Sequence, residues 1–264
     1  MSPKIIVFAA PDAEYHAIEM SLPRRWGVIR CGSFQAMARN LADDDVAWVL
    51  LELDPTRSID LEMLKRAIDC RRTQADALIR FELSRYACRI VLSILQIMPD
   101  ATLSIRPFDS LELAVRSLAN RSEGPSAHAH ILRCIAPLAP SSVRDLFVTA
   151  ALVASRRLSV AEFAHCLGYS ERTVHARLAS GRLPRPRQLI ASMVALHSAW
   201  RLDRLGWAPK RAARAAGFTS QASFGNYLKR NVGATPSQLA ETGGFDQART
   251  VVESRIRGAG SSQD

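Results

Sequence analysis

The sequence predicts two domains of different fold class: an α/β domain with a five-stranded parallel sheet over residues 1–120, and an all-α domain over residues 141–245. A chain of 264 residues is long for a single domain. Short apolar segments alternate with helical patterns only in the first half. The charge changes at the same place, because residues 1–120 contain 15 Lys and Arg against 16 Asp and Glu, whereas residues 121–264 contain 20 against 9.

Five strand candidates follow one another in the first half, at residues 4–10, 27–32, 46–53, 77–84 and 101–108. Helix candidates lie between and after them, at residues 12–22, 33–42, 59–72, 86–98 and 109–120. Continuous apolar strands that alternate with helices are typical of βα units around a parallel sheet covered on both faces. We therefore expect a flavodoxin-like domain.

Two segments are expected to lack regular structure. The stretch NRSEGPSAHAH at 120–130 is rich in polar and small residues and contains a Gly-Pro step, which favours a linker over residues 121–140. Residues 246–264 are expected to form a disordered tail.

Composition and cysteine spacing exclude several classes of protein. The five cysteines are far apart and none lies in a CxxC pair, which argues against a disulfide framework and a zinc site and suits a reducing cytoplasm. No catalytic residues, metal ligands or cofactor motif can be assigned. The basic second half favours nucleic acid as the partner over an anionic membrane, since no apolar run is long enough to span a bilayer.

The second half contains one supersecondary pattern twice. Ser159 and Glu162 form a predicted capping box, and Ala164 is followed four residues later by Gly168 and then by Val174. This order supplies a small residue where two helices touch, a glycine that can take positive φ at the turn, and an apolar anchor for the second helix. The pattern predicts a helix-turn-helix.

The pattern returns as Ala213, Gly217 and Phe224. Between the two copies, Leu189, Met193, Leu196 and Trp200 repeat at the spacing of one helix face. We expect one long helix that packs on both units and fixes their separation. A capping box at Thr235 and Gln238 opens a closing helix.

The segment ARAAGFTSQASFGNYLKRNVGATPSQL resembles the second half of the DNA-binding domain of the AraC/XylS family of transcription regulators, and FAHCLGYSERTVHARL matches the first half more loosely. The resemblance implies that two recognition helices enter successive major grooves of double-stranded DNA. Carried over by position, the base-contacting residues are Arg172, His175, Gln221, Ser223 and Asn226. The phosphate-contacting residues are Ser170, Arg177, Ser220, Lys229 and Arg230. Gly225 departs from the family pattern, because it places a poor helix former in the middle of the second recognition helix.

The first half resembles the receiver domain of response regulators in VLLELDP and in IRPFDSLELAVRSLA. The resemblance implies a degenerate site made of Glu52, Asp54, Ser84 and Arg106. Glu52 takes the place of the phosphoacceptor Asp, Arg106 that of the Lys, and alanines that of the metal-binding acidic pair. Glu52 and Arg106 are expected either to form an ion pair or to be solvated at their strand ends.

Three functions remain open at this stage. The favoured one is a sequence-specific regulator whose receiver-like domain is not phosphorylated and serves for homodimerisation or partner contact, RNA polymerase included. The alternative is a phosphorelay response regulator phosphorylated on an N-terminal carboxylate. A small-molecule sensor is the third, although the family's usual sensor is a β-barrel and this half does not have that pattern.

Overall fold

The computed structural model describes residues 3–8, 12–22, 24–43, 45–54, 58–71, 75–106, 109, 127–156, 158–241 and 243–258. The helix predicted at 109–120 lies outside these ranges apart from Asp109, as do residues 121–126 of the predicted linker. The chain divides into two units, Met1–Ala129 and His130–Asp264.

The N-terminal unit has the predicted alternation of strands and helices. In order these are β1 (Lys4–Phe8), α1 (Asp12–Ser21), β2 (Gly27–Cys31), α2 (Phe34–Leu41), β3 (Val46–Leu53), α3 (Leu61–Asp69), β4 (Asp76–Glu82), α4 (Arg85–Ile97) and β5 (Thr102–Arg106). The five strands form one parallel sheet in the order β2-β1-β3-β4-β5. This is the flavodoxin-like order, which confirms the predicted fold class.

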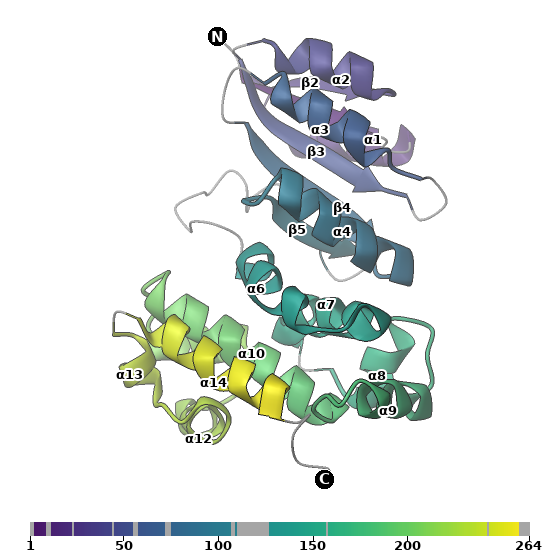
Figure 1. The fold of residues 1–264 in the computed structure, drawn as a ribbon. Helices are drawn as coiled ribbons and strands as arrows, with labels where there is room; N and C mark the ends of the chain where they lie inside the picture. Colours follow the sequence, from purple (N-terminus) through teal and green to yellow (C-terminus); the bar gives the residue numbers. More distant parts are fainter. Residues whose placement is uncertain are drawn as a thin grey trace. The chain divides into compact units, whose positions relative to one another are not determined.

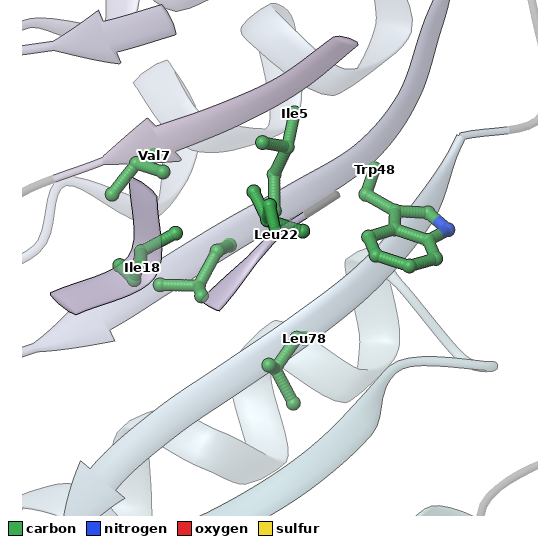
Figure 2. Close-up of a cluster of buried hydrophobic side chains, with 7 residues drawn as sticks. Ile5, Val7, Ile18, Leu22, Trp48 and Leu78 are labelled. Carbon is green, nitrogen blue, oxygen red and sulfur yellow. The ribbon is translucent and has the colours of Figure 1, made fainter. Parts of the chain in front are cut away.

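One face of the sheet packs against α1. Because side chains alternate along a strand, Ile5 and Val7 point to the same face. They form an apolar cluster with residues of α1, β3 and β4 and with Leu22, which directly follows α1 (Figure 2): Ile5, Val7, Ile18, Leu22, Trp48, Leu50 and Leu78. The Trp26 ring lies 4.3 Å from the Trp48 ring, centroid to centroid, and extends the cluster.

The opposite face is covered by α2, α3 and α4, which lie in a row in Figure 1. Phe8, the neighbour of Val7, points to this face and stacks on Phe34 of α2 with ring centroids 4.4 Å apart. Ser33 and Asp60 accept hydrogen bonds from the first turns of α2 and α3, so both helices begin at side-chain caps. Helices on both faces leave the carboxyl ends of the strands as the place where polar side chains gather.

The C-terminal unit is all-α. Its helices are α6 (Ala127–Ile135, which begins in the other unit), α7 (Arg144–Leu152), α8 (Val160–His165), α9 (Glu171–Ser180), α10 (Pro186–Asp203), α11 (Pro209–Ala215), α12 (Gln221–Val232), α13 (Pro236–Leu239) and α14 (Gly244–Gly258). The 18-residue helix α10 contacts α7, α9, α11, α12, α13 and α14. Its predicted apolar face, from Leu189 to Trp200, is buried. The expectation of one long helix that packs on both repeated units is confirmed.

The expectation of a linker over residues 121–140 is wrong from residue 127 onward. Ala127–Ile135 is helical, and a short 3-10 turn, Ala136–Leu138, follows it. His130 lies in an aromatic cluster, with its ring 4.3 Å from Trp200 and 5.3 Å from Phe245, centroid to centroid. Apolar contacts from His130 onward therefore attach this segment to the C-terminal unit.

The expectation of a disordered tail over residues 246–264 is wrong as far as residue 258. Helix α14 buries Phe245, Ala248, Val252 and Ile256, which repeat at helical spacing and pack along α10 (Figure 1). The Phe245 backbone N–H donates to a carboxylate oxygen of Asp203 at 2.9 Å, and Arg204 donates to Asp246 at 2.7 Å. These bonds fix the start of α14 against the end of α10.

Candidate nucleic-acid interface

The first repeated unit consists of α8 and α9, joined by a tight turn. Gly168 has φ of 66°, the left-handed conformation that the sequence pattern requires at the turn. The predicted capping box is present, since Ser159 N–H donates to Glu162 at 2.8 Å and Glu162 N–H donates to Ser159 Oγ at 3.2 Å. Val174 is fully buried and anchors α9. The first unit is a helix-turn-helix, as predicted.

Helix α9 presents two of the predicted base-contacting residues to solvent. Ser170 caps the helix, because its Oγ accepts from Thr173 N–H at 3.1 Å. Arg172 and His175 lie beyond this cap on the exposed side of α9. Ser170 Oγ also lies 2.8 Å from the Thr173 hydroxyl. The Ser170 hydroxyl, which we had expected to contact phosphate, therefore holds the start of the recognition helix.

Arg177, a predicted phosphate contact, binds a carboxylate within the same unit. Its guanidinium donates to both carboxylate oxygens of Asp145, at 2.8 and 2.9 Å, and also to the carbonyl oxygen of Ser142. It lies over the Tyr169 ring, and Tyr169 donates to the same Asp145 at 2.9 Å. Hydrogen bonds to Asp145 raise the pKa of Arg177. Because Asp145 is buried in α7, this pair fixes α9 to the domain, and a phosphate contact by Arg177 stays a prediction.

The second repeated unit consists of α11 and α12. Gly217 has φ of 75° at the turn, and Ser220 Oγ accepts from Ser223 N–H at 3.1 Å to cap α12. Phe224 is fully buried, with its ring 5.3 Å from that of Phe218. The expected skeleton of small residue, turn glycine and apolar anchor is present a second time.

Helix α12 presents a polar strip to solvent. Gln221, Ser223 and Asn226 are exposed, as expected of base-contacting residues. The Ser223 hydroxyl accepts a hydrogen bond from the Ser220 hydroxyl at 2.9 Å, so both predicted contact residues also take part in the helix cap. Because Ser223 is the acceptor in this pair, its own O–H is left to donate to a base.

Two cations remain on α12 for phosphate contact. Lys229 and Arg230 are exposed in its last turns, and among the described residues neither has an ion-pair partner. Gly233, with φ of 74°, ends the helix directly after them. Both side chains are therefore exposed to solvent close to the C-terminal end of α12.

A second polar cluster lies at the carboxyl ends of the strands in the N-terminal unit. Arg106 of β5 contacts Glu52 of β3, with Nη2 and Oε1 3.1 Å apart, which confirms the expected ion pair. Arg106 also donates to Glu14 of α1 at 2.6 Å, and Arg80 of β4 donates to Glu14 at 3.1 Å. Arg80 lies 3.6 Å from Glu52. Two carboxylates and two guanidinium groups therefore form one cluster.

Glu52 is almost completely buried, so the expectation of a solvated strand end is wrong. Burial raises the pKa of the Glu52 carboxyl to about 7, against the opposing effect of Arg106 and Arg80, while the Glu14 carboxylate raises it further. The two oxygens are close to the arginines without good hydrogen-bond geometry. Charge attraction therefore offsets only part of the cost of burial.

The other predicted receiver residues have separate places. Ser84 caps α4, since its Oγ accepts from Ala87 N–H at 3.0 Å. Asp54 follows β3 and is half-buried, and Asp12 pairs with Arg30 at 2.5 Å. The alanines 9 and 10 lie outside the described residues. The cluster does not suit Mg²⁺, because its carboxylates are already neutralised by two guanidinium groups that repel a cation. Within the described ranges, no three His, Cys, Asp or Glu side chains gather as a metal site.

Three functional or positioning residues were missed from the sequence. Glu14 and Arg80 complete the charged cluster, and Asp145 binds Arg177 across 32 positions of chain. Arg80 and Asp145 had a usable signal, because each is a charged residue inside an otherwise apolar strand or helix, where a buried partner is required. Nothing in the sequence marks Glu14, which lies on an ordinary amphipathic helix.

The geometry of the C-terminal unit, with two capped and exposed recognition helices on one connecting helix, defines a DNA-binding protein of the helix-turn-helix class. A family model described as a helix-turn-helix domain matches residues 163–242. The match runs from within α8 to just past α13 and so includes both repeated units.

No curated protein matches the chain. Among solved structures, RcsB from Salmonella enterica serovar Typhimurium, bound to promoter P1flhDC in the presence of phosphomimetic BeF3-, is 14% identical, with a TM-score of 0.38 and coverage of 87% of this chain and 100% of its own. Full-length FixJ from B. japonicum is 17% identical, with a TM-score of 0.33 and coverage of 82% and 98%. Both TM-scores are low, so the fold assignment depends on the strand order and the family match. None of the described helices is both long and apolar enough to cross a membrane.

Proposed function

We propose that the C-terminal unit recognises a specific DNA sequence by placing α9 and α12 in successive major grooves. The observation that carries this proposal is the repeat itself: two helix-turn-helix units pack on the single helix α10, and each presents polar side chains from the first turns of its second helix. Major grooves recur about every 34 Å along one face of the duplex. A rigid spacer between two recognition helices suits that geometry.

The exposed side chains divide into two groups by chemistry. Arg172 can donate two hydrogen bonds to guanine, and Gln221 or Asn226 can pair with adenine, because these are the base edges that the major groove presents. His175 and Ser223 are the remaining base-contacting candidates. Lys229 and Arg230 are suited to phosphates, which position the protein without specifying sequence.

The proposal predicts salt-dependent and sequence-dependent binding by the full-length chain. Affinity for a preferred duplex should fall steeply between roughly 50 and 200 mM salt, because phosphate contacts release counterions. Gln221→Ala should reduce the ratio of specific to non-specific affinity more than it reduces non-specific affinity. Fluorescence anisotropy with preferred and scrambled duplexes measures both, and an equal loss on all duplexes would contradict the base-contacting role.

We further propose that the N-terminal unit is not phosphorylated and acts by pairing two chains or by contacting a partner such as RNA polymerase. The support is the charged cluster: Glu52 occupies the position of a phosphoacceptor, and its carboxylate is buried against Arg106 and Arg80. A carboxylate held in this way is a poor nucleophile towards a phosphoryl donor. The near-neutral charge of this half also distinguishes it from the DNA-binding half.

Two measurements test this second proposal. Treatment of the full-length chain with acetyl phosphate and Mg²⁺ should leave the mass of peptides from residues 1–120 unchanged, and a mass increase of one phosphoryl group on Glu52 or Asp54 would restore the phosphorelay alternative. Light scattering of the full-length chain should give a dimer that is lost when residues 1–120 are removed. A monomer in both cases would leave partner contact as the role of this unit.

A further inference from the structure

Three adjoining hollows join the two recognition helices across the first half of α10. The hollow beside α9 is lined by Arg172 and His175, and it shares Arg185 and Gln188 with the next hollow. That central hollow has a volume of about 1120 Å³ and extends along α10 to α12. It shares Tyr227 and Arg230 with a third hollow.

The third hollow contains the proposed base-contacting residues Ser223 and Asn226 of α12. Because neighbouring hollows share lining residues, they form one concave surface from α9 to α12. We refer to the central part, lined by Arg185, Arg187 and Arg230, as the α10 groove. It therefore opens on the side of the unit that carries the proposed base contacts.

The α10 groove is strongly basic. Arg185 and Arg187 flank the first residue of α10, and Arg230 faces them from α12. All three are exposed, and none has an ion-pair partner in the part of the chain that the structure describes. Glu171, at the start of α9, is the one carboxylate among the lining residues. The groove therefore has an excess of positive charge that no described residue neutralises.

The shape of the groove is fixed by hydrogen bonds to its walls. Arg255 of α14 donates to the carbonyl oxygen of Asn231 at 2.7 Å and to Ser192 Oγ at 3.2 Å, which ties α14 to both α12 and α10. The Tyr227 hydroxyl donates to the carbonyl oxygen of Ala191 at 3.1 Å. These bonds hold α12 at a set distance from α10 before any ligand binds.

We propose that the α10 groove binds the phosphodiester backbone of the DNA segment that lies between the two major grooves. This inference rests on the proposed function, because it requires α9 and α12 to occupy successive grooves. A duplex that contacts both helices must pass its intervening backbone across the surface between them, and that surface is the groove. Arginine forks suit phosphate oxygens, and the contact would add affinity without adding base preference.

An acidic protein segment would also be attracted to this groove. DNA is favoured because the groove is continuous with the surfaces of both recognition helices, so a bound duplex would cover it. A protein segment in the same place would block the DNA site. The two occupants can be distinguished by removing charge from the DNA instead of from the protein.

The test uses the full-length chain and a duplex recovered by binding-site selection, with neutral methylphosphonate linkages placed either between the two half-sites or in the outer flanks. Central neutral linkages should weaken binding of the wild type and have no further effect on the Arg187→Gln/Arg230→Gln variant. The variant should also lower the slope of log affinity against log salt by about 1.8, or about 0.9 for each lost contact. Arg257→Gln, an exposed arginine of the same unit outside all three hollows, serves as the control and should behave as the wild type.

Equal weakening of wild type and variant by central neutral linkages, or no weakening of either, would overturn the inference while sequence preference remains intact. A wild type that binds preferred and scrambled duplexes equally well would be a different result. It would contradict the proposed function, and with it this inference. Thermal unfolding of the variants should match that of the wild type, since both side chains are exposed.

Discussion

The two helix-turn-helix units share a skeleton but are stabilised by different interactions. In the first unit, α9 is fixed to α7 by the ion pair between Arg177 and Asp145, with Tyr169 stacked on the guanidinium. In the second, α12 is fixed by apolar contacts of Phe224 with Phe218, and by hydrogen bonds that Tyr227 and Arg255 donate to backbone carbonyl oxygens. The spacing of alanine, glycine and anchor thus determines the topology, while the residues around it determine how each recognition helix is held.

The helix ends differ in the same way. Helix α12 stops at Gly233 in the left-handed conformation, and the capping box of Thr235 and Gln238 follows at once. Helix α9 is followed by Arg182, a residue other than glycine with φ of 53°. A side chain in that conformation is strained, so the first unit has the less favourable termination. We therefore expect the first unit to be the less stable of the two.

The largest effect should come from removing the apolar anchor of the second unit. Phe224→Ala deletes a fully buried ring and should lower the free energy of unfolding of the C-terminal unit by about 3–5 kcal/mol. Urea denaturation monitored by Trp200 and Trp207 fluorescence measures this change. A loss well under 1 kcal/mol would show that the second unit does not depend on aromatic packing.

A buried charge in the N-terminal unit extends the comparison to pH. Because burial raises the pKa of Glu52 to about 7, the folded unit holds a proton that the unfolded chain releases at a lower pH, near 4.5. Glu52 therefore makes its full contribution to the free energy of unfolding of this unit below pH 4.5. That free energy should fall by roughly 3 kcal/mol as the pH rises to about 7.

Hydrogen exchange of peptides from β3, corrected for intrinsic rates, measures this dependence across the same pH range. Glu52→Gln provides the matched control, because it keeps the shape of the side chain and removes its titration. A wild-type dependence that survives unchanged in Glu52→Gln would show that another group is responsible.

The ion pair of the first unit should give a smaller effect than the aromatic anchor. Asp145→Ala leaves Arg177 without its carboxylate and should cost roughly 1.5–3 kcal/mol, because hydrogen bonds to a charged group are lost while the guanidinium stays partly exposed. Thermal unfolding measures the loss. The Asp145→Ala/Arg177→Ala double variant should recover part of it; strict additivity of the two single changes would contradict a direct coupling.

The smallest effect should be a gain at Gly225 in the middle of α12. A Cβ placed there meets only Pro236, with its nearest atom at 3.7 Å, which is ordinary van der Waals contact. Gly225→Ala should therefore stabilise the second unit by up to about 1 kcal/mol through helix propensity. Denaturation midpoints measure the gain, and destabilisation would mean that Gly225 is required for the packing of α12 against α13.

The sequence predicted those features that depend on local patterns. The parallel sheet follows from βα alternation, and the caps at Ser159 and Thr235 follow from short polar residues placed directly before helical patterns. Exposure of Arg172 and Gln221 follows from the same helical periodicity. These interactions span only a few residues, so a single sequence is enough to predict them.

Features that depend on distant partners could not be predicted in this way. Arg177 resembles any exposed cation on α9 until the fold brings Asp145 within reach. Glu14 joins Arg80 across 66 positions of chain. Helix α14 is a different case, because Phe245, Ala248 and Val252 stand at helical spacing in the sequence. Polar and charged residues lie between them, and the segment is therefore predicted as a tail.

The central claim is that both units contact bases, and selection of binding sites from a random library by the full-length chain tests it most directly. The recovered motif should contain two conserved elements about 10–10.5 base pairs apart, centre to centre. Repeated with Arg172→Ala, the selection should relax one element, and with Gln221→Ala it should relax the other. Recovery of a single element, unaffected by Arg172→Ala, would contradict recognition by two helices.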